Sequence, residues 1–330
     1  MSGTTHNTAA ADWTLDPADA AACERLARTL SAGGHDQVDS PAWVARARDA
    51  WDELPLPLRR AVRRFRRHSG PHGTLVIGGL PVDRAALPAT PSVLGSVQRR
   101  AAVPAAVLTM VACGLGEPLA YLAEKTGALV QDVVPVPGQE SFHSNAGSVP
   151  LSFHTENGFH PHPPDYVVFL CLRADHDRTA GMRVAGIRQA VPLLTRAGRE
   201  ALFAPEFITT PPPSFGPDAG SGAGAEPRPV LFGAAEDPDI RMAQLVTSPL
   251  TPRATAALAE FGRACEATAR TLRLVPGDLV VIDNRVTVHG RTAFRPRYDG
   301  ADRWLQRTYV TTDLRRSRDH RPADGHVLAR

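Results

Sequence analysis

The 330-residue sequence has few cysteines and few aromatic residues, and it contains no long apolar run. Its four cysteines lie far apart and form no Cys-x-x-Cys pair, which argues against a disulfide framework and against a thiolate zinc site. No stretch approaches the roughly 20 consecutive apolar residues of a membrane helix, and the first residues show no basic segment followed by an apolar run. We therefore expect a cytoplasmic protein that neither spans a membrane nor carries a secretory signal.

A strong excess of one charge is also missing. The formal net charge is +3, and the fractions of hydrophobic (43%) and charged (22%) residues are those of a globular protein. The densest basic run is RRAVRRFRR at residues 59–67, where the spacing is helical and aromatic residues are scarce. We interpret this run as a solvated helix face, with binding to nucleic acid or to a membrane surface as the alternative.

A helical first third is followed by β-rich sequence. Asp16-Pro17 and Ser40-Pro41 look like helix starts, a third helix is expected at residues 58–68, and an amphipathic segment lies at 103–113. The remaining expected elements are β-rich runs from residue 74 onward, a helix at 251–272, and strands at 279–283 and 303–310. We expect a single domain with a helical part (1–70), a core (74–314) and a tail (315–330).

Proline and glycine dominate the segment from Thr209 to Pro229, which cannot sustain a helix or an interior strand. A linker between two domains is one interpretation. We prefer a lid loop over residues 209–240, because long loops inside compact domains are often functional and candidate motifs lie on both sides of it.

The segment LSFHTE at residues 151–156 alternates as a strand does, which would place His154 and Glu156 on the same face. Residues two apart on a strand are roughly 6.5 to 7 Å apart at Cα, so an imidazole and a carboxylate there can converge on one ion. A His-x-Glu triplet alone is a weak signal, because such triplets also occur by chance on ordinary strands.

A second histidine, His289, follows an apolar strand in PGDLVVIDNRVTVHGR. Two histidines and one carboxylate with open coordination positions form the facial triad of non-haem Fe(II) oxygenases. A hydrolytic zinc site uses the same residue set, so ligand identity leaves both metals open. We take His154, Glu156 and His289 as candidate metal ligands and as the catalytic centre.

Two arginines downstream of His289 bear on this choice. Arg303 and Arg307 follow it by 14 and 18 residues, in a strand-like segment that would point both side chains to one face. Buried guanidinium groups are costly unless carboxylates meet them. Two inward arginines therefore imply two carboxylate ligands, a 2-oxoacid cosubstrate and an acidic or amino-acid substrate. A surface strand with external salt bridges is the alternative.

Three segments taken together indicate a family: residues 144–173 (SNAGSVPLSFHTENGFHPHPPDYVVFLCLR), 283–291 (DNRVTVHGR) and 302–310 (DRWLQRTYV). In them the sequence resembles the clavaminate synthase-like branch of Fe(II)/2-oxoglutarate-dependent oxygenases, which includes the asparagine and arginine hydroxylases of nonribosomal peptide pathways. A looser resemblance runs from about residue 75 to residue 314. The combination is specific, because His-Thr-Glu followed 133 residues later by the histidine of VHGR, and then by two arginines, is hard to obtain by chance.

The resemblance implies a mainly β fold with flanking helices, a distorted double-stranded β-helix of the jelly-roll, cupin-like type. It implies Fe(II), 2-oxoglutarate and O2 as cofactors. The implied reaction is hydroxylation of an sp3 carbon, β or γ, of an amino acid or a related small molecule in peptide or antibiotic biosynthesis. Desaturation, epoxidation and cyclisation remain open at the same iron.

The resemblance also implies roles for single residues, beginning with iron binding by the three candidate ligands. It makes Arg303 the partner of the C5 carboxylate of 2-oxoglutarate and Arg307 the partner of the substrate carboxylate. Glu124 and Asn145 match family positions that hold the α-amino group and backbone of an amino-acid substrate. Without the resemblance, Glu124 would be interpreted as a surface acid and Asn145 as a turn residue.

Two departures from the family pattern affect the expected ligands. Where relatives carry a threonine pair that helps to hold 2-oxoglutarate, this chain has Met182-Arg183, so we expect Arg183 or another donor to substitute. Where relatives that act on polar or cationic side chains carry an aspartate in an IRxD pattern, this chain has Ala243. A cationic side chain would lack a partner there. We therefore expect a neutral or apolar side-chain pocket, unless an acidic residue of the segment 236–239 supplies the charge.

The predicted partner is a small-molecule amino acid or dipeptide, and no nucleic acid or membrane. A carrier-protein thioester remains open, although Arg307 favours a free carboxylate, which a thioester lacks. His160 and His162 lie in a proline-rich turn, where we expect solvent-facing or supporting roles rather than a second metal site. A zinc hydrolase and a non-catalytic binding module on an oxygenase scaffold are the competing functions.

Overall fold

The computed structural model describes residues 8–9, 11–32, 37–211, 215 and 226–329, and three α-helices precede the five-residue strand at 74–78. They are α1 (Pro17–Ser31), α2 (Pro41–Glu53) and α3 (Leu56–Arg67). The first two begin where the sequence predicts. Asp16 accepts a hydrogen bond from the N–H of Asp19, and Ser40 accepts one from that of Trp43, which caps each helix before its first-turn proline.

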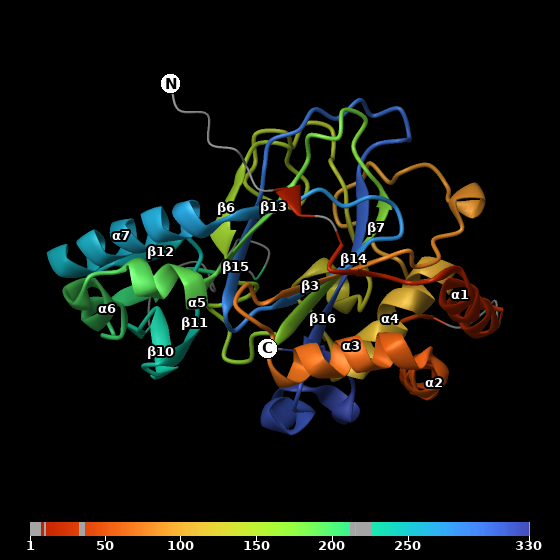
Figure 1. The fold of residues 1–330 in the computed structure, drawn as a ribbon, viewed down its shortest axis with the longest axis horizontal. Coiled ribbons are helices and arrows are strands. Elements are labelled where there is room, and N and C mark those ends of the chain that lie inside the picture. Colours follow the sequence, from red (N-terminus) through yellow and green to blue (C-terminus); the bar gives the residue numbers. More distant parts are fainter. Residues whose placement is uncertain (1–7, 10, 33–36, 212–214, 216–225, 330) are drawn as a thin grey trace.

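An eight-stranded sheet lies at the centre of the molecule, and α1 to α4 cover one of its faces (Figure 1). In order its strands are β17 (Val327–Leu328), β4 (Glu117–Tyr121), β16 (Trp304–Thr311), β7 (Tyr166–Arg173), β14 (Leu279–Asp283), β3 (Thr74–Gly78) and β2 (Trp13–Thr14), with β5 (Gln131–Val133) also paired to β16. In β7, Val168 and Leu170 pack against the helices, while Val167 and Phe169 face the other way. Both faces are buried, so the strand is a continuous apolar run.

A five-stranded sheet faces this other side. In order its strands are β1 (Thr8–Ala9), β13 (Arg270–Leu272), β8 (Met182–Gly186), β15 (Thr287–Arg291) and β6 (Leu151–His154). Met182 and Val184 of β8 share a buried cluster with Phe169 and Leu305 of the larger sheet. The two sheets therefore enclose an apolar interior between them.

The outer face of the smaller sheet is covered by α5 (Ile187–Ala190), α6 (Arg196–Leu202) and α7 (Pro252–Thr268). Figure 1 shows α6 and α7 on the opposite side of the molecule from α1 to α4. The short 3-10 helices are η1 (Arg84–Ala86), η2 (Lys125–Gly127), η3 (Val191–Leu193), η5 (Leu314–His320) and η6 (Pro322–Asp324). Among the described residues, no helix combines the length and the apolar character needed to cross a bilayer.

Two predicted helices differ in detail. The predicted amphipathic segment is α4 (Val103–Leu115), which is buried on nearly all sides because it lies between the other N-terminal helices and the larger sheet. The helix expected at 251–272 ends at Thr268, and its last predicted residues form β13.

The predicted lid loop over residues 209–240 is wrong at its C-terminal end, where β10 (Leu231–Ala234) and β11 (Asp237–Ile240) form a hairpin. At its other end, β9 (Phe207–Thr209) pairs with β12 (Thr247–Pro249). Residues 212–214 and 216–225 of the predicted loop lie outside the described residues. The predicted tail is also more structured than expected, because η5, η6 and β17 follow residue 313 and β17 joins the larger sheet beside β4.

Candidate active site

The two predicted histidine ligands lie side by side on neighbouring strands. β6 and β15 pair antiparallel with His154 opposite His289, and the two ring centroids are 4.4 Å apart. Glu156 lies in a turn after the end of β6, so the prediction that strand alternation orients its carboxylate is wrong. Its Oε1 is nevertheless 3.4 Å from Nε2 of His289, and one donor atom from each of the three residues lies within 4.8 Å of the other two.

Asn284 holds the turn that carries Glu156. Its Oδ1 accepts a hydrogen bond from the Glu156 N–H at 2.8 Å, and its Nδ2 donates to the carbonyl oxygens of Glu156 at 3.0 Å and of Pro164 at 2.9 Å. Asn284 lies between β14 and β15, so one buried amide ties the Glu156 turn to the strand pair that carries His289. The only sequence signal for Asn284 is its place inside DNRVTVHGR.

Burial and neighbouring charges prepare these groups for a cation. Burial, and after it the nearby His289, lowers the pKa of His154 to about 4, so this imidazole is neutral at pH 7. Its Nδ1 lies 2.9 Å from the Ser152 carbonyl oxygen and donates to it, which leaves Nε2 as a free donor atom for a metal. Burial alone would raise the pKa of Glu156, but Arg307 and the two histidines outweigh it and hold that pKa far below its ordinary value. An ionised carboxylate between two imidazoles is a donor set that Fe(II) accepts.

Arg307 lies at the centre of a polar cluster beside Glu156. Its side chain is 1% exposed, and its Nη1 donates to Oε1 of Glu156 at 2.8 Å. Its Nη2 donates to Oε1 of Glu124 and to Oε1 of Gln131, both at 2.5 Å. With its amide oxygen turned toward the guanidinium, Asn145 accepts hydrogen bonds from Nη1 at 3.1 Å and Nη2 at 3.3 Å. The structure thus brings Glu124, Asn145 and Arg307 together, and it adds Gln131, for which the sequence carries no signal.

Arg303 is buried beside a second arginine that sequence reasoning missed. The guanidinium groups of Arg303 and Arg291 lie 5.8 Å and 5.2 Å from the ring centroid of Phe294. Burial lowers the pKa of both, and with the added charge of Arg303 the pKa of Arg291 falls to about 9. Among the described residues neither forms an ion pair with a carboxylate, and Arg291 donates to the carbonyl oxygens of Ser144 and Val149. This concentration of buried positive charge fits a carboxylate group brought by a ligand.

The structure corrects the prediction for Arg183. This residue pairs with Glu266 of α7, with 2.7 Å between Nη2 and Oε2, and its guanidinium stacks on the ring of Phe153 at 4.9 Å. Strand alternation turns the neighbouring Met182 and Val184 inward, so Arg183 faces outward toward α7. Arg183 is therefore not a 2-oxoglutarate donor.

Ala243 lies directly beside the predicted metal site, where it forms an isolated β-bridge with His154. Of the acidic residues in the segment 236–239, Asp239 lines a separate cavity together with Phe232 and Arg285. Asp237 is taken by Arg188, whose Nε donates to it at 2.6 Å, and Glu236 is exposed.

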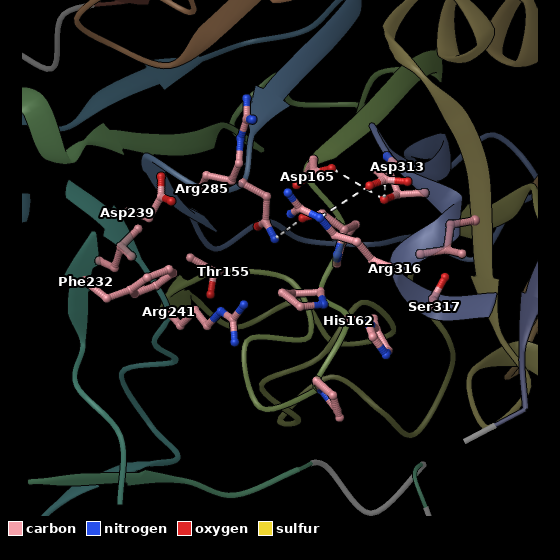
Figure 2. Close-up of a pocket in the computed structure, with 17 residues that line it drawn as sticks. Thr155, His162, Asp165, Phe232, Asp239, Arg241, Arg285, Asp313, Arg316 and Ser317 are labelled. Carbon is pink, nitrogen blue, oxygen red and sulfur yellow. Dashed lines mark hydrogen bonds and ion pairs between the residues drawn. The ribbon is translucent and has the colours of Figure 1, made fainter. Parts of the chain in front are cut away.

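A cavity of about 180 Å³ is lined by residues that include Thr155, His162, Arg241 and Asn284, and Figure 2 shows the first three of them. The described residues that line this cavity include none of the predicted site residues. The cavity is therefore distinct from the predicted metal site.

His160 and His162 belong to none of the possible metal-binding groups found among the described residues. His160 is buried, with its ring edge-on to Tyr121 at a centroid distance of 4.8 Å, so it is not solvent-facing. Within the described part of the chain, the residue groups able to hold a metal are the predicted triad and His176, Asp299 and Asp302.

Comparison with known proteins agrees with this geometry. The model of the taurine catabolism dioxygenase TauD, TfdA family matches residues 225–309. Asparagine oxygenase of Streptomyces coelicolor is 57% identical over 96% of this chain and 94% of its own length. Clavaminate synthase 2 of Streptomyces clavuligerus is 35% identical over 84% of this chain and 86% of its own.

A crystal structure of asparagine oxygenase in complex with Fe(II), 2S,3S-3-hydroxyasparagine and succinate matches this fold with a TM-score of 0.93 at 56% identity, covering 96% of this chain and 98% of that one. The resemblance inferred from the sequence is therefore confirmed. It excludes the two competing functions, a zinc hydrolase and a non-catalytic binding module. The chain belongs to the TauD/TfdA family of dioxygenases, in the amino-acid hydroxylase branch with asparagine oxygenase, and is a non-haem enzyme dependent on Fe(II), 2-oxoglutarate and O2.

Proposed function

We propose that this enzyme hydroxylates the β carbon of a free amino acid that has a neutral side chain. The observation that carries the proposal is the 2.8 Å contact between Nη1 of Arg307 and Oε1 of Glu156. It places a buried partner for an amino-acid carboxylate next to a candidate iron ligand. An amino acid held by Arg307 would bring its α and β carbons toward that ligand, and a relative with a 3-hydroxylated product supports the β position.

The polar cluster around Arg307 has the groups that an amino-acid backbone needs. Glu124 offers a carboxylate to the α-ammonium group, and Asn145 offers an amide beside it. A carrier-bound thioester has no free carboxylate for Arg307. These contacts therefore favour a free amino acid over a carrier-bound one.

The iron would be held by His154, Glu156 and His289, and Arg303 would hold the far carboxylate of 2-oxoglutarate. Bound there, iron supplies the O2 activation that oxidises the substrate C–H bond while 2-oxoglutarate becomes succinate and CO2. Neutral His154 and ionised Glu156 are already in the protonation states that metal binding requires. Arg291 adds positive charge beside Arg303, which favours a doubly charged cosubstrate there.

Ala243 favours a pocket that accepts a neutral side chain of the amino-acid substrate. Its methyl group lies beside His154 and cannot pair a guanidinium or an ammonium group. A charge left unpaired in a buried pocket costs several kcal/mol, on the order of the penalty for breaking a buried ion pair. Cationic amino acids should therefore be rejected.

At the level of the fold, the two facing sheets would form the distorted double-stranded β-helix of a single jelly-roll domain. The shared buried cluster between the sheets supports this arrangement, and β6 and β15 carry the histidines at one edge of the smaller sheet. A barrel of this type can enclose a ligand and hold the metal at its mouth.

The test is turnover with a panel of free amino acids and dipeptides. Anaerobic enzyme loaded with Fe(II) and 2-oxoglutarate is mixed with each compound, oxygen is added, and products are analysed by mass spectrometry and NMR. We expect a +16 product hydroxylated at the β carbon of a neutral amino acid, with equimolar succinate. Product formed only from basic amino acids or only from carrier-bound ones would contradict the proposal.

A further inference from the structure

Tyr309 is a buried tyrosine that lies between two carboxylates of the site. It follows Arg307 by two residues on β16, so both side chains project from the same face of the strand. Its hydroxyl oxygen lies 3.0 Å from both carboxylate oxygens of Glu124 and 3.3 Å from Oε2 of Glu156. Its side chain is 1% exposed.

The same two carboxylates also share Arg307. The guanidinium donates to Oε1 of Glu156 and to Oε1 of Glu124, while the hydroxyl reaches Oε2 of Glu156 from the other side. Oε1 of Glu156 is also the oxygen that faces His289, at 3.4 Å. The two oxygens of Glu156 therefore have separate environments, with Oε1 toward Arg307 and His289 and Oε2 toward the tyrosine.

A phenol carries one proton at neutral pH, so the hydroxyl can donate to only one acceptor at a time. Glu124 and Glu156 compete for that proton. The hydroxyl is within reach of Glu156 without a bound amino acid, and an ammonium group at Glu124 would shift its proton further toward Glu156. Donation to Oε2 fixes the rotation of the carboxylate and keeps Oε1 directed at His289.

We propose that Tyr309 is a positioning residue that orients the carboxylate of Glu156 for the metal and links it to Glu124. The inference rests on the proposed metal centre and adds a residue to which no role is assigned above. It acts through Glu156 and touches no reacting atom.

The test is Tyr309→Phe, which removes one oxygen atom and keeps the ring in its packing. The probe is Co(II) added to metal-free protein under anaerobic conditions, without 2-oxoglutarate or amino acid, followed by its visible d–d absorption. Second-sphere partners of metal ligands typically contribute 10- to 100-fold in affinity. We expect the dissociation constant of Co(II) to rise about ten-fold and the d–d bands to shift.

Tyr121→Phe is the matched control. Tyr121 is also 1% exposed and packs edge-on against Tyr309 at 5.6 Å, but its hydroxyl donates to the carbonyl oxygen of His162. It should leave the Co(II) affinity and spectrum unchanged, and circular dichroism should show both variants folded.

Each possible result either supports or overturns the proposal. Weaker Co(II) binding with shifted bands in Tyr309→Phe alone supports the proposal. Unchanged or tighter Co(II) binding in Tyr309→Phe overturns the proposal and leaves the proposed metal centre intact. Equal losses of Co(II) affinity in Tyr309→Phe and Tyr121→Phe also overturn the proposal, because ring packing would then be the cause. If wild type itself does not bind Co(II), the proposed centre fails and this inference fails with it.

Discussion

Nη1 of Arg307 and Oε1 of Glu156 are 2.8 Å apart, although 151 residues separate them in the sequence. The contact joins a residue suited to a substrate carboxylate to one suited to a metal. Because the guanidinium is buried, any group that displaces this contact must itself be an anion of similar geometry. Amino-acid binding and metal binding are therefore expected to depend on each other.

The two arginines of the site should affect different ligands. Arg307→Lys keeps a charge but loses the two-pronged donor, so we expect the amino acid to bind about ten- to a hundred-fold more weakly, as for the loss of a charge-assisted contact. Arg303→Lys should instead weaken the binding of the 2-oxoacid cosubstrate by a similar factor. Steady-state kinetics with each ligand varied in turn measure both effects as changes in apparent KM. Arg183→Lys is the control, since its pairing with Glu266 on the outer face predicts no change for either ligand.

Removal of either histidine should abolish metal binding without unfolding the protein. His154→Ala and His289→Ala each delete one of three donor groups, and the spectroscopic band of the Fe(II)–2-oxoglutarate complex should disappear together with turnover. Circular dichroism should remain that of wild type, because these side chains form the site rather than one of the apolar clusters. Near-wild-type activity in either variant would refute the assignment of the triad.

Ala243→Asp should broaden the preference toward polar and basic side chains. The new carboxylate would lie beside His154 and could pair a cationic group that the wild-type pocket leaves unpaired. Competition between matched neutral and basic amino acids measures the shift. Ala235→Asp makes the same change at an exposed position of the β10–β11 hairpin and should not alter the preference. Wild-type enzyme that already turns over arginine or lysine as well as neutral analogues would disprove the neutral pocket.

The metal-free protein should lose stability as the pH falls from 6.5 toward 4. The pKa of His154 is about 4 in the folded protein and near its ordinary value of 6.5 in the unfolded chain, so the unfolded state binds more protons in this window. At pH 5 the loss from this group alone is about 2 kcal/mol relative to pH 7. Urea denaturation at pH 7 and pH 5, with chelator present, should show this difference in wild type and a smaller one in His154→Asn. An equal pH dependence in the two proteins would show that His154 titrates normally.

Local signals in the sequence were sufficient for much of the fold and for the triad. Capping residues and first-turn prolines located α1 and α2, and the apolar runs located β7 and β14. The two histidines and Glu156 were found because metal ligation requires particular residue types at compatible spacing. Each of these features depends on neighbours in the sequence or on a residue type that chemistry restricts.

The remaining features depend on register and on contacts between distant segments. Arg183 was misplaced because a strand position faces inward or outward according to a register that only the pairing of β8 with β15 determines. Gln131 and Tyr309 are ordinary polar residues in their own strands. Gln131 joins the site because β5 pairs with β16 and places it opposite Arg307, and Tyr309 joins it because β16 pairs with β4 and β7. The seventeenth strand escaped prediction because two residues, Val327 and Leu328, are too few to form a pattern.

β16 pairs with β4, β5 and β7, all of which precede it by more than 130 residues. During synthesis, the edges of these earlier strands remain open until residues 304–311 emerge. Such long-range pairing is slow, and open strand edges invite aggregation. Because Arg307 and Tyr309 lie on this same strand, the nascent chain cannot hold an amino acid until its largest sheet has closed. We therefore expect the yield of soluble enzyme to rise with slower translation or with added chaperones.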